Sequence, residues 1–373
     1  MTVRDKLSTG AVSSALTPLS RLYGGAAFLR RARHDNGLMR VKRLPCPTVS
    51  IGNITTGGTG KTPMTIHIAT LLKAAGLSPL IVSRGYKGSA SKRGGIVSDG
   101  KHLLMDAGCS GDEPLLMAER LPGVPVAVGR DRYRIATEAI GRFAPDVVLL
   151  DDGFQHFQLA RDIDIVLLDH ARPLGNGRLL PAGPLREPPS AIRKADIIVF
   201  TRADQTAGFR PGGLERLISG KPCFAAFHVP VVTAWITGGR SIAGDDRPLP
   251  ETNALARRRA FVFCGLADNP AFIESVGRLG VKITGHRFFR DHHACTDAEL
   301  NAVSREAKRN NTDIIITSAK DHVKFRDRPT PTLPGDLVVL DAAISFREQS
   351  EQFKNLLLEK IERSREPLNP LEP

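Results

Sequence analysis

Residues 50–66 read SIGNITTGGTGKTPMTI, which is a short apolar strand, a glycine-rich turn and the start of a helix. Gly57, Gly58 and Gly60 lack side chains, so consecutive backbone N–H groups can turn inward and surround an anion at the positive end of the helix. Lys61 adds a mobile cation, and Thr62 adds a hydroxyl that suits Mg²⁺. This order predicts a nucleotide-phosphate loop. Its binding residues are expected to be Thr55, Thr56, Gly57, Gly58, Thr59, Gly60, Lys61, Thr62 and Pro63.

The match to the usual GxxxxGK[ST] pattern is incomplete, because Thr55 stands where the first glycine is expected. The alternative is a glycine-rich turn that only joins a strand to a helix. The order of strand, three glycines, GKT and helix favours the phosphate loop over that alternative.

After this loop the chain repeats short apolar runs that end in polar or charged residues. They lie in residues 77–86, 124–132, 145–156, 162–170 and 195–204, and helix-length segments separate several of them. Buried parallel strands with functional carboxyl ends have this pattern in a doubly wound sheet. We therefore expect an α/β fold of the P-loop NTPase type, with a mostly parallel sheet flanked by helices.

Two stretches of this half contain candidate acidic groups. VVLLDD ends in Asp151 and Asp152, and an acidic residue at the end of a buried strand can hold Mg²⁺ directly or through water. The alternative there is a strand that is merely capped. CSGDEP places Asp112 before an amphipathic helix, so this residue is either a helix cap or a general base. Residues 172–188 form an irregular loop that could close over a substrate.

The N-terminal segment, residues 1–43, holds nine Lys or Arg and two Asp, which is more than half of the formal charge of +13. Its apolar residues are compatible with an amphipathic helix broken near Pro18, and no run approaches the ~20 apolar residues of a transmembrane helix. The segment either packs on its own domain or lies on an anionic leaflet, where each basic residue contributes ~1 kcal/mol. Five scattered cysteines without a CxxC pair indicate a reduced, cytosol-facing protein.

Beyond this segment we expect a phosphate-loop domain over 44–229, a linker over 230–259 with a strand-like run at 231–236, a smaller α/β domain over 260–346, and a C-terminal helix and tail over 347–373. The smaller domain is expected to contain a helix over 297–309 and strands in 281–289, 313–321 and 336–344. Asp291, His292, His293 and Cys295 match no spacing of a zinc site. A histidine that orients a catalytic carboxylate across an interdomain cleft is the preferred interpretation. Lys320 and Lys324 follow an apolar strand and either face that cleft or lie in a solvated loop.

Eight motifs in this order resemble the tetraacyldisaccharide 4′-kinases of lipid A synthesis over about residues 45–325. They are GNITTGGTGKTP, VSRGY, GDEP, VGRDR, DDGFQH, LLPAGPLREP, the DHH loop and TSAKD. Thr55 and Pro63 are themselves marks of that family. The resemblance implies a kinase that moves the γ-phosphate of ATP, with Mg²⁺, onto the 4′-hydroxyl of a tetraacylated glucosamine disaccharide 1-phosphate. It also implies a peripheral or monotopic protein on the cytoplasmic face of the bacterial inner membrane, which favours membrane contact for the N-terminal segment.

The resemblance also assigns roles to residues. It implies that Lys61 and Thr62 bind phosphates and Mg²⁺, that Asp112 is the base and that His292 is its partner. Asp151, Asp152 and Gln155 match the family's metal-binding strand end. Contacts to the substrate or to phosphates are expected from Arg84, Tyr86, Arg130, Arg186, Glu187 and Lys320.

Two other classes of function remain open. A GTPase-like switch or metallochaperone is suggested by TRAD at 201–204, which imitates a guanine-reading motif, although Arg202 replaces the expected lysine. A nucleic-acid-binding protein is suggested by charge alone. Aromatic residues make up only 5% and no basic run is interleaved with them, so we expect no nucleic-acid partner. The sequence leaves the oligomeric state open.

Overall fold

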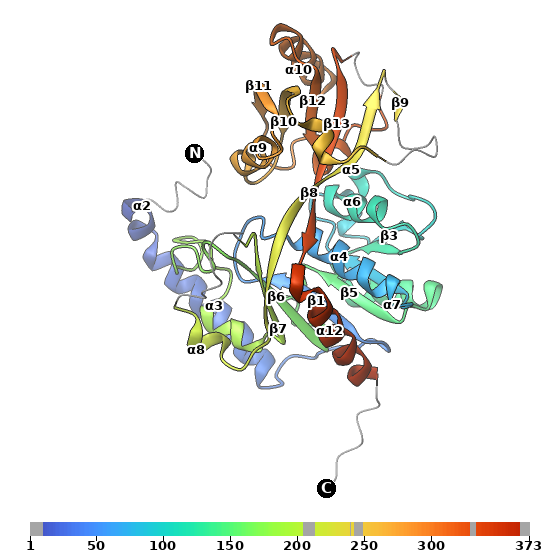
Figure 1. Cartoon of the computed structure of the whole chain (residues 1–373). Helices are drawn as coiled ribbons and strands as arrows, with labels where there is room; N and C mark the ends of the chain where they lie inside the picture. Colours follow the sequence, from blue (N-terminus) through green and yellow to red (C-terminus); the bar gives the residue numbers. More distant parts are fainter. Residues whose placement is uncertain (1–9, 204–212, 239, 242–248, 329–332, 366–373) are drawn as a thin grey trace. The chain divides into compact units, whose positions relative to one another are not determined.

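The computed structural model describes residues 10–203, 213–238, 240–241, 249–328 and 333–365. The chain forms two compact units (Figure 1). The larger consists of Met1–Ser110, Met117–His228 and Ile344–Pro373, and the smaller of Gly111–Leu116 and Val229–Ala343. Each unit is an α/β structure, and each is described here by itself.

The sheet of the larger unit has the strand order β8-β7-β6-β1-β5-β2-β4-β3. Its strands are β1 (Thr48–Asn53), β2 (Pro79–Ser83), β3 (Gly95–Ser98), β4 (Val126–Val128), β5 (Val147–Asp151), β6 (Ile163–Asp169), β7 (Ile197–Thr201) and the first part of β8 (Cys223–Thr237). All neighbouring pairs are parallel except β3 with β4. The parallel sheet expected from the apolar runs is confirmed. The edge strand β3 was not expected, because its four residues form no apolar run long enough to be recognised.

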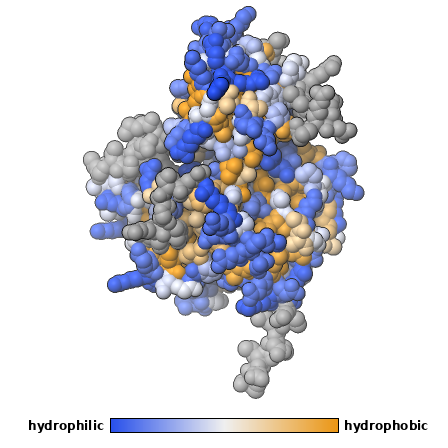
Figure 2. All heavy atoms as spheres, viewed as in Figure 1, coloured by the Kyte–Doolittle hydropathy of each residue, from blue (hydrophilic) through white to orange (hydrophobic). Residues whose placement is uncertain are grey.

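Helices and buried side chains cover this sheet. The unit contains α4 (Lys61–Ala74), α5 (Ala107–Ser110), α7 (Arg132–Phe143), α8 (Glu215–Ile218) and α12 (Ser350–Arg365). It also contains the end of α6 (Asp112–Arg120), from Met117 onward. Ile135 of α7 packs with Leu80 of β2 and Leu150 of β5 in one buried cluster. A second buried cluster includes Val166 of β6 and Ile198 of β7, together with Leu185 and Ile192 from the segment between these strands. On the face shown in Figure 2, hydrophilic residues surround patches of apolar ones.

Two helices begin the described part of the chain, α2 (Gly10–Ala15) and α3 (Thr17–Asp35). The break near Pro18 is confirmed, because the proline lies in the first turn of α3, where its missing N–H needs no partner. The hydroxyl of Ser20 donates to the Leu179 carbonyl at 2.8 Å, which attaches α3 to the irregular loop before β7. Among the described residues, no helix is long and apolar enough to cross a bilayer.

The smaller unit has its own mostly parallel sheet, in the order β11-β10-β12-β13-β8. Its strands are β10 (Arg259–Cys264), β11 (Lys282–Phe288), β12 (Ile314–Ser318), β13 (Asp336–Ser345), the later part of β8 and β9 (Arg240–Ser241), which pairs with β8. Its helices are α9 (Asn269–Gly277), α10 (Asp297–Arg309) and α11 (Ala319–His322). The helix expected over 297–309 and the strands expected in this half are confirmed.

The division differs from the expected one in three places. The expected linker over 230–259 is not a plain linker, because β8 continues to Thr237 within it. The segment Gly111–Leu116, expected in the phosphate-loop domain, belongs to the smaller unit, and α12 belongs to the larger one. These assignments depend on pairing between distant segments, such as β8 with β13, which local sequence does not encode.

Candidate active site

The phosphate loop connects β1 to α4. Gly57 and Gly60 have φ angles of +103° and +79°, a region that glycine enters without steric cost. Gly60 is the N-cap of α4, and the N–H of Met64 donates to its carbonyl at 3.0 Å. A Cβ at Gly60 would lie 2.7 Å from Nε2 of His228, so the close packing at this position also requires glycine. The loop therefore presents consecutive backbone groups at the positive end of a 14-residue helix.

The side chain of Asn53 and a second loop support the start of the phosphate loop. Asn53 Nδ2 donates to the hydroxyl of Thr59 at 2.8 Å. The N–H of Thr56 donates to the carbonyl of Pro184 at 2.7 Å. Residues 172–188, expected to be an irregular substrate loop, thus contact the phosphate loop directly.

Asp152 lies among three cationic side chains at the end of β5. Its carboxylate accepts from Arg186 Nη1 at 3.0 and 3.1 Å and lies 3.7 Å from Lys61 Nζ. Its carbonyl accepts from Nη1 of the buried Arg132 at 2.8 Å. Burial raises the pKa of Asp152, but the charges of Lys61 and Arg186 outweigh that effect and lower it to about 2. The carboxylate is therefore ionised at neutral pH.

Asp151 is buried one residue earlier. It accepts from the hydroxyls of Ser83 at 2.9 Å and Thr65 at 3.5 Å. Gln155 follows on the next turn, and its Nε2 donates to Oε1 of Glu187 at 2.9 Å. The oxygens of these residues and of Thr62 are the hard donors that Mg²⁺ prefers. The donor chemistry thus fits a magnesium ion, although the described residues contain no group of three His, Cys, Asp or Glu side chains arranged to hold a metal.

A second polar cluster lies in the smaller unit and is centred on Asp112. His292 Nδ1 is 3.0 Å from Asp112 Oδ2, and its Nε2 is 3.7 Å from Asp291 Oδ2. From the sequence, these two partners were expected to meet across an interdomain cleft, but both belong to this unit. Burial raises the pKa of Asp112, yet the His292 hydrogen bond and the charge of Lys324 lower it below its usual value. Asp112 is thus an ionised carboxylate with an imidazole fixed beside it.

Two lysines complete this cluster. Lys324 Nζ is 2.8 Å from Asp321 Oδ1 and 3.5 Å from Asp112 Oδ2, and its side chain is only 3% exposed. Lys320 Nζ contacts Glu113 at 3.0 Å and Asp291 at 3.1 Å. Burial lowers the pKa of Lys320, but these two carboxylates raise it above its ordinary value. The solvated-loop alternative for both lysines is therefore wrong.

Three of the expected substrate residues, Arg84, Tyr86 and Arg130, are exposed, so their roles stay predictions. Glu187 instead is buried and accepts from Arg31 Nε of α3 at 2.7 Å and from Gln155. The zinc alternative finds no support here, since His293 pairs with Glu299.

Sequence reasoning missed Arg31 and Arg132 and gave Lys324 no role. VGRDR contains both Arg130 and Arg132, and nothing local says which arginine turns inward. The position of Arg132 at the first residue of α7, directly after the N-cap Asp131, is a signal that could have favoured it. For Arg31 no local signal exists, because its partner Glu187 is distant in sequence.

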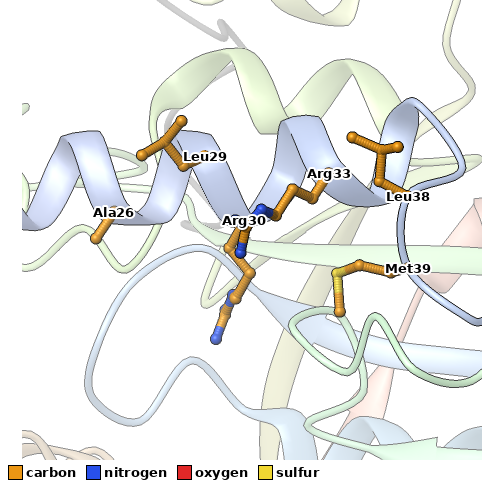
Figure 3. A pocket seen from close by; sticks show the side chains of 6 residues that line it. All are labelled: Ala26, Leu29, Arg30, Arg33, Leu38 and Met39. Atoms are coloured by element: carbon orange, nitrogen blue, oxygen red, sulfur yellow. The ribbon is translucent and has the colours of Figure 1, made fainter.

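A pocket lies beside α3 and the turn that follows it. It has a volume of about 690 Å³ and is lined by Ala26, Leu29, Arg30, Arg33, Leu38 and Met39 (Figure 3). Leu22, Phe28, Leu29 and Leu38 are all largely exposed. The surface of α3 therefore combines exposed apolar side chains with arginines.

Comparisons with known proteins agree with one another. A family model described as tetraacyldisaccharide-1-P 4′-kinase matches residues 12–362. The tetraacyldisaccharide 4′-kinase of Desulfatibacillum aliphaticivorans is 37% identical over 353 residues, which covers 95% of this chain and 94% of that protein. The tetraacyldisaccharide 4′-kinase of Anaeromyxobacter dehalogenans is 41% identical over 320 residues, which covers 85% of this chain and 82% of that protein. The structure of "apo" form LpxK from Aquifex aeolicus in complex with ATP matches with a TM-score of 0.73 and 32% identity, over 94% of this chain and 99% of that one.

Proposed function

The chain belongs to the tetraacyldisaccharide-1-P 4′-kinase family, and from this premise we propose how its own residues carry out the family's reaction. The protein is an ATP-dependent kinase of lipid A biosynthesis, which transfers the γ-phosphate of ATP to the 4′-hydroxyl of a tetraacylated glucosamine disaccharide 1-phosphate. The main support for the proposed catalytic residues is the contact of His292 Nδ1 with Asp112 Oδ2 at 3.0 Å. The same chain also contains the phosphate loop.

The donor nucleotide is bound by the phosphate loop of the larger unit. Backbone N–H groups of residues 55–62 and the ammonium of Lys61 neutralise charge on its phosphates. Thr62, Asp151, Asp152 and Gln155 would hold Mg²⁺, which supplies further charge neutralisation when bound. Lys61 lies 3.7 Å from Asp152, so the ammonium is already directed toward this group of oxygens.

The acceptor hydroxyl is deprotonated by Asp112. A base must be ionised to accept a proton, and the lowered pKa of Asp112 keeps it so at neutral pH. His292 holds the carboxylate in one orientation through its Nδ1 contact. Lys320 and Arg186 are the half-buried cations proposed to contact anionic groups of the two substrates, with Arg84, Tyr86 and Arg130 as further contacts.

A kinase assay on the purified protein tests this proposal. ATP-dependent phosphorylation of a tetraacylated disaccharide 1-phosphate in detergent micelles is expected for the wild type. Asp112→Asn should lower kcat by about 100-fold or more, because general-base catalysis contributes about 10²–10⁴-fold, while KM for ATP changes little. Asp327→Asn is the matched control, since that carboxylate is 74% exposed. Unchanged kcat in Asp112→Asn would remove this residue as the base, and GTP preferred over ATP would favour the switch class instead.

For the N-terminal helices, we propose contact with the cytoplasmic face of the inner membrane. Leu19, Leu22, Ala26 and Leu29 recur along α3 at helical spacing, and the three leucines are exposed. Arg30 and Arg33 lie beside them at the pocket of Figure 3. Apolar side chains can enter the interface while arginines contact anionic head groups.

Flotation with vesicles that contain anionic lipid tests the membrane proposal. Replacing Leu22 and Leu29 together by Ser should weaken binding by at least about tenfold, because each buried leucine contributes roughly 1.5–3 kcal/mol. Leu104→Ser is the control, since Leu104 is exposed elsewhere in the larger unit. Equal binding by the double variant and the wild type would place the contact surface elsewhere.

A further inference from the structure

Two carbonyl groups of the phosphate loop are bound by the end of strand β7. Arg202 Nη2 donates to the carbonyl of Gly58 at 2.6 Å, and the hydroxyl of Thr201 donates to the carbonyl of Thr59 at 2.9 Å. Consecutive residues of one strand end thus bind consecutive carbonyls of the loop. Strand β6 lies between β7 and β1 in the sheet, so these contacts come from a strand that does not pair with the one preceding the loop.

Because of the geometry of the peptide bond, these contacts also determine the direction of two backbone N–H groups of the phosphate loop. In a trans peptide the C=O and the N–H point in opposite directions. The cis bond that the described residues contain is Leu180–Pro181, so the bonds on either side of Thr59 are trans. When the carbonyls of Gly58 and Thr59 point to β7, the N–H groups of Thr59 and Gly60 point away from it. Both N–H groups belong to the stretch proposed to surround phosphate.

Both donors are themselves held in place. Thr201 is fully buried, and its hydroxyl lies 3.4 Å from the Leu168 carbonyl as well. Arg202 forms an ion pair with Asp169 at 3.2 Å and has a φ of +56°. That left-handed conformation is strained for a non-glycine residue, and such conformations gather at functional sites.

We propose that Thr201 and Arg202 are positioning residues, which set the N–H groups of Thr59 and Gly60 in the orientation that binds the nucleotide's phosphates before the nucleotide arrives. This inference rests on the proposed nucleotide site. It also gives the TRAD stretch a task other than guanine reading, since its arginine binds backbone of the protein itself. Asp204, the last residue of that stretch, lies outside the described residues.

A pair of nearly isosteric variants tests this role. Thr201→Val removes the hydroxyl and should raise Kd for ADP and KM for ATP about fivefold to tenfold. Thr201→Ser keeps the hydroxyl and should stay within about twofold of the wild type. Arg202→Met should raise Kd for ADP and KM for ATP by about tenfold or more. Arg202→Lys should raise both constants less than Arg202→Met does. KM for the lipid acceptor should not change in any of them, whereas a general disturbance of the fold would raise it too.

Two results would overturn the positioning role of Thr201 and Arg202. Thr201→Val and Arg202→Met with wild-type Kd for ADP would overturn it, as would equal losses in Thr201→Val and Thr201→Ser. If Arg202→Met fails to fold, the valine and serine pair still decides. Lys61→Met separates the two proposals. If it weakens ADP binding while Thr201→Val does not, only this inference fails, and if the wild type binds no nucleotide, the proposed function fails.

Discussion

At the scale of single residues, Lys324 is a lysine whose ammonium is buried beside carboxylates instead of exposed to solvent. Its ammonium is in contact with Asp321 and close to Asp112, and it donates to the carbonyl of His293 at 3.2 Å. A cation beside a carboxylate favours the ionised form. We therefore expect Lys324 to act through the proposed base Asp112, as a positioning residue.

Lys324→Met should move the acid limb of the kcat/KM profile to higher pH. Without the ammonium, one of the charges that lower the pKa of Asp112 is lost. The pKa therefore rises, and the proposed base becomes protonated at a higher pH as the pH falls. A pH series of initial rates measures this shift. Asp321 keeps its hydrogen bonds from Ser318 and the Gly265 N–H, which should let the variant fold.

Lys308→Met, an exposed change at the end of α10, serves as the control for that series. An acid limb that stays at the wild-type position in Lys324→Met would show that this lysine does not tune Asp112. In the double variant Lys324→Met with Asp321→Asn, the loss of the ammonium is balanced by the loss of a carboxylate charge. If the acid limb is still shifted in this double variant, the shift arises from the lost Lys324–Asp112 contact.

At the scale of elements, the sequence predicted best where structure is encoded locally. Helix α10 has its boundary signals within four residues, as the Thr296 side chain accepts from the Glu299 N–H and Glu299 binds back to the Thr296 backbone. The phosphate loop is similar, because its glycines act through their own backbone. Strand β8 was misjudged as part of a linker, since its pairing with β13 joins segments about a hundred residues apart. Arg31 was missed for the same reason, since its partner Glu187 is distant in sequence, whereas Arg132 was missed because nothing local distinguishes it from Arg130.

Thr296→Ala should lower the stability of the smaller unit by about 1 kcal/mol, because the N–H of Glu299 in the first turn of α10 loses its acceptor. Urea unfolding followed by circular dichroism measures the change. Thr296→Ser retains the hydroxyl and should lose much less. Equal midpoints for the alanine variant and the wild type would mean that the smaller unit does not depend on this cap.

At the scale of the whole molecule, three half-buried histidines link stability to pH. Burial and, to a smaller extent, neighbouring arginines lower the pKa of His156, His228 and His322 to about 4. Their ordinary value is about 6.5, so between that pH and about 4 the unfolded chain binds protons that the folded chain does not. The histidine contribution to stability is therefore lost as pH falls through this window.

We expect Tm to be lower at pH 5 than at pH 7, with each histidine contributing up to about 1.4 kcal/mol per pH unit. Scanning calorimetry measures this for each unit, since His322 belongs to the smaller and the other two to the larger. His322→Gln should flatten the dependence in the smaller unit. His102→Gln is the control, because that side chain is 74% exposed. Equal Tm at both pH values would contradict the expected linkage.

The contact of Arg31 with Glu187 bears on how the enzyme could be engineered. Deleting α3 would remove the proposed membrane contact, but it would also remove the arginine and leave the carboxylate of Glu187 buried without its cation. An uncompensated buried charge is costly, and Glu187 also binds Gln155 beside the phosphate loop. Polar replacement of the exposed leucines, with the helix and Arg31 retained, is the safer design for a detergent-free enzyme.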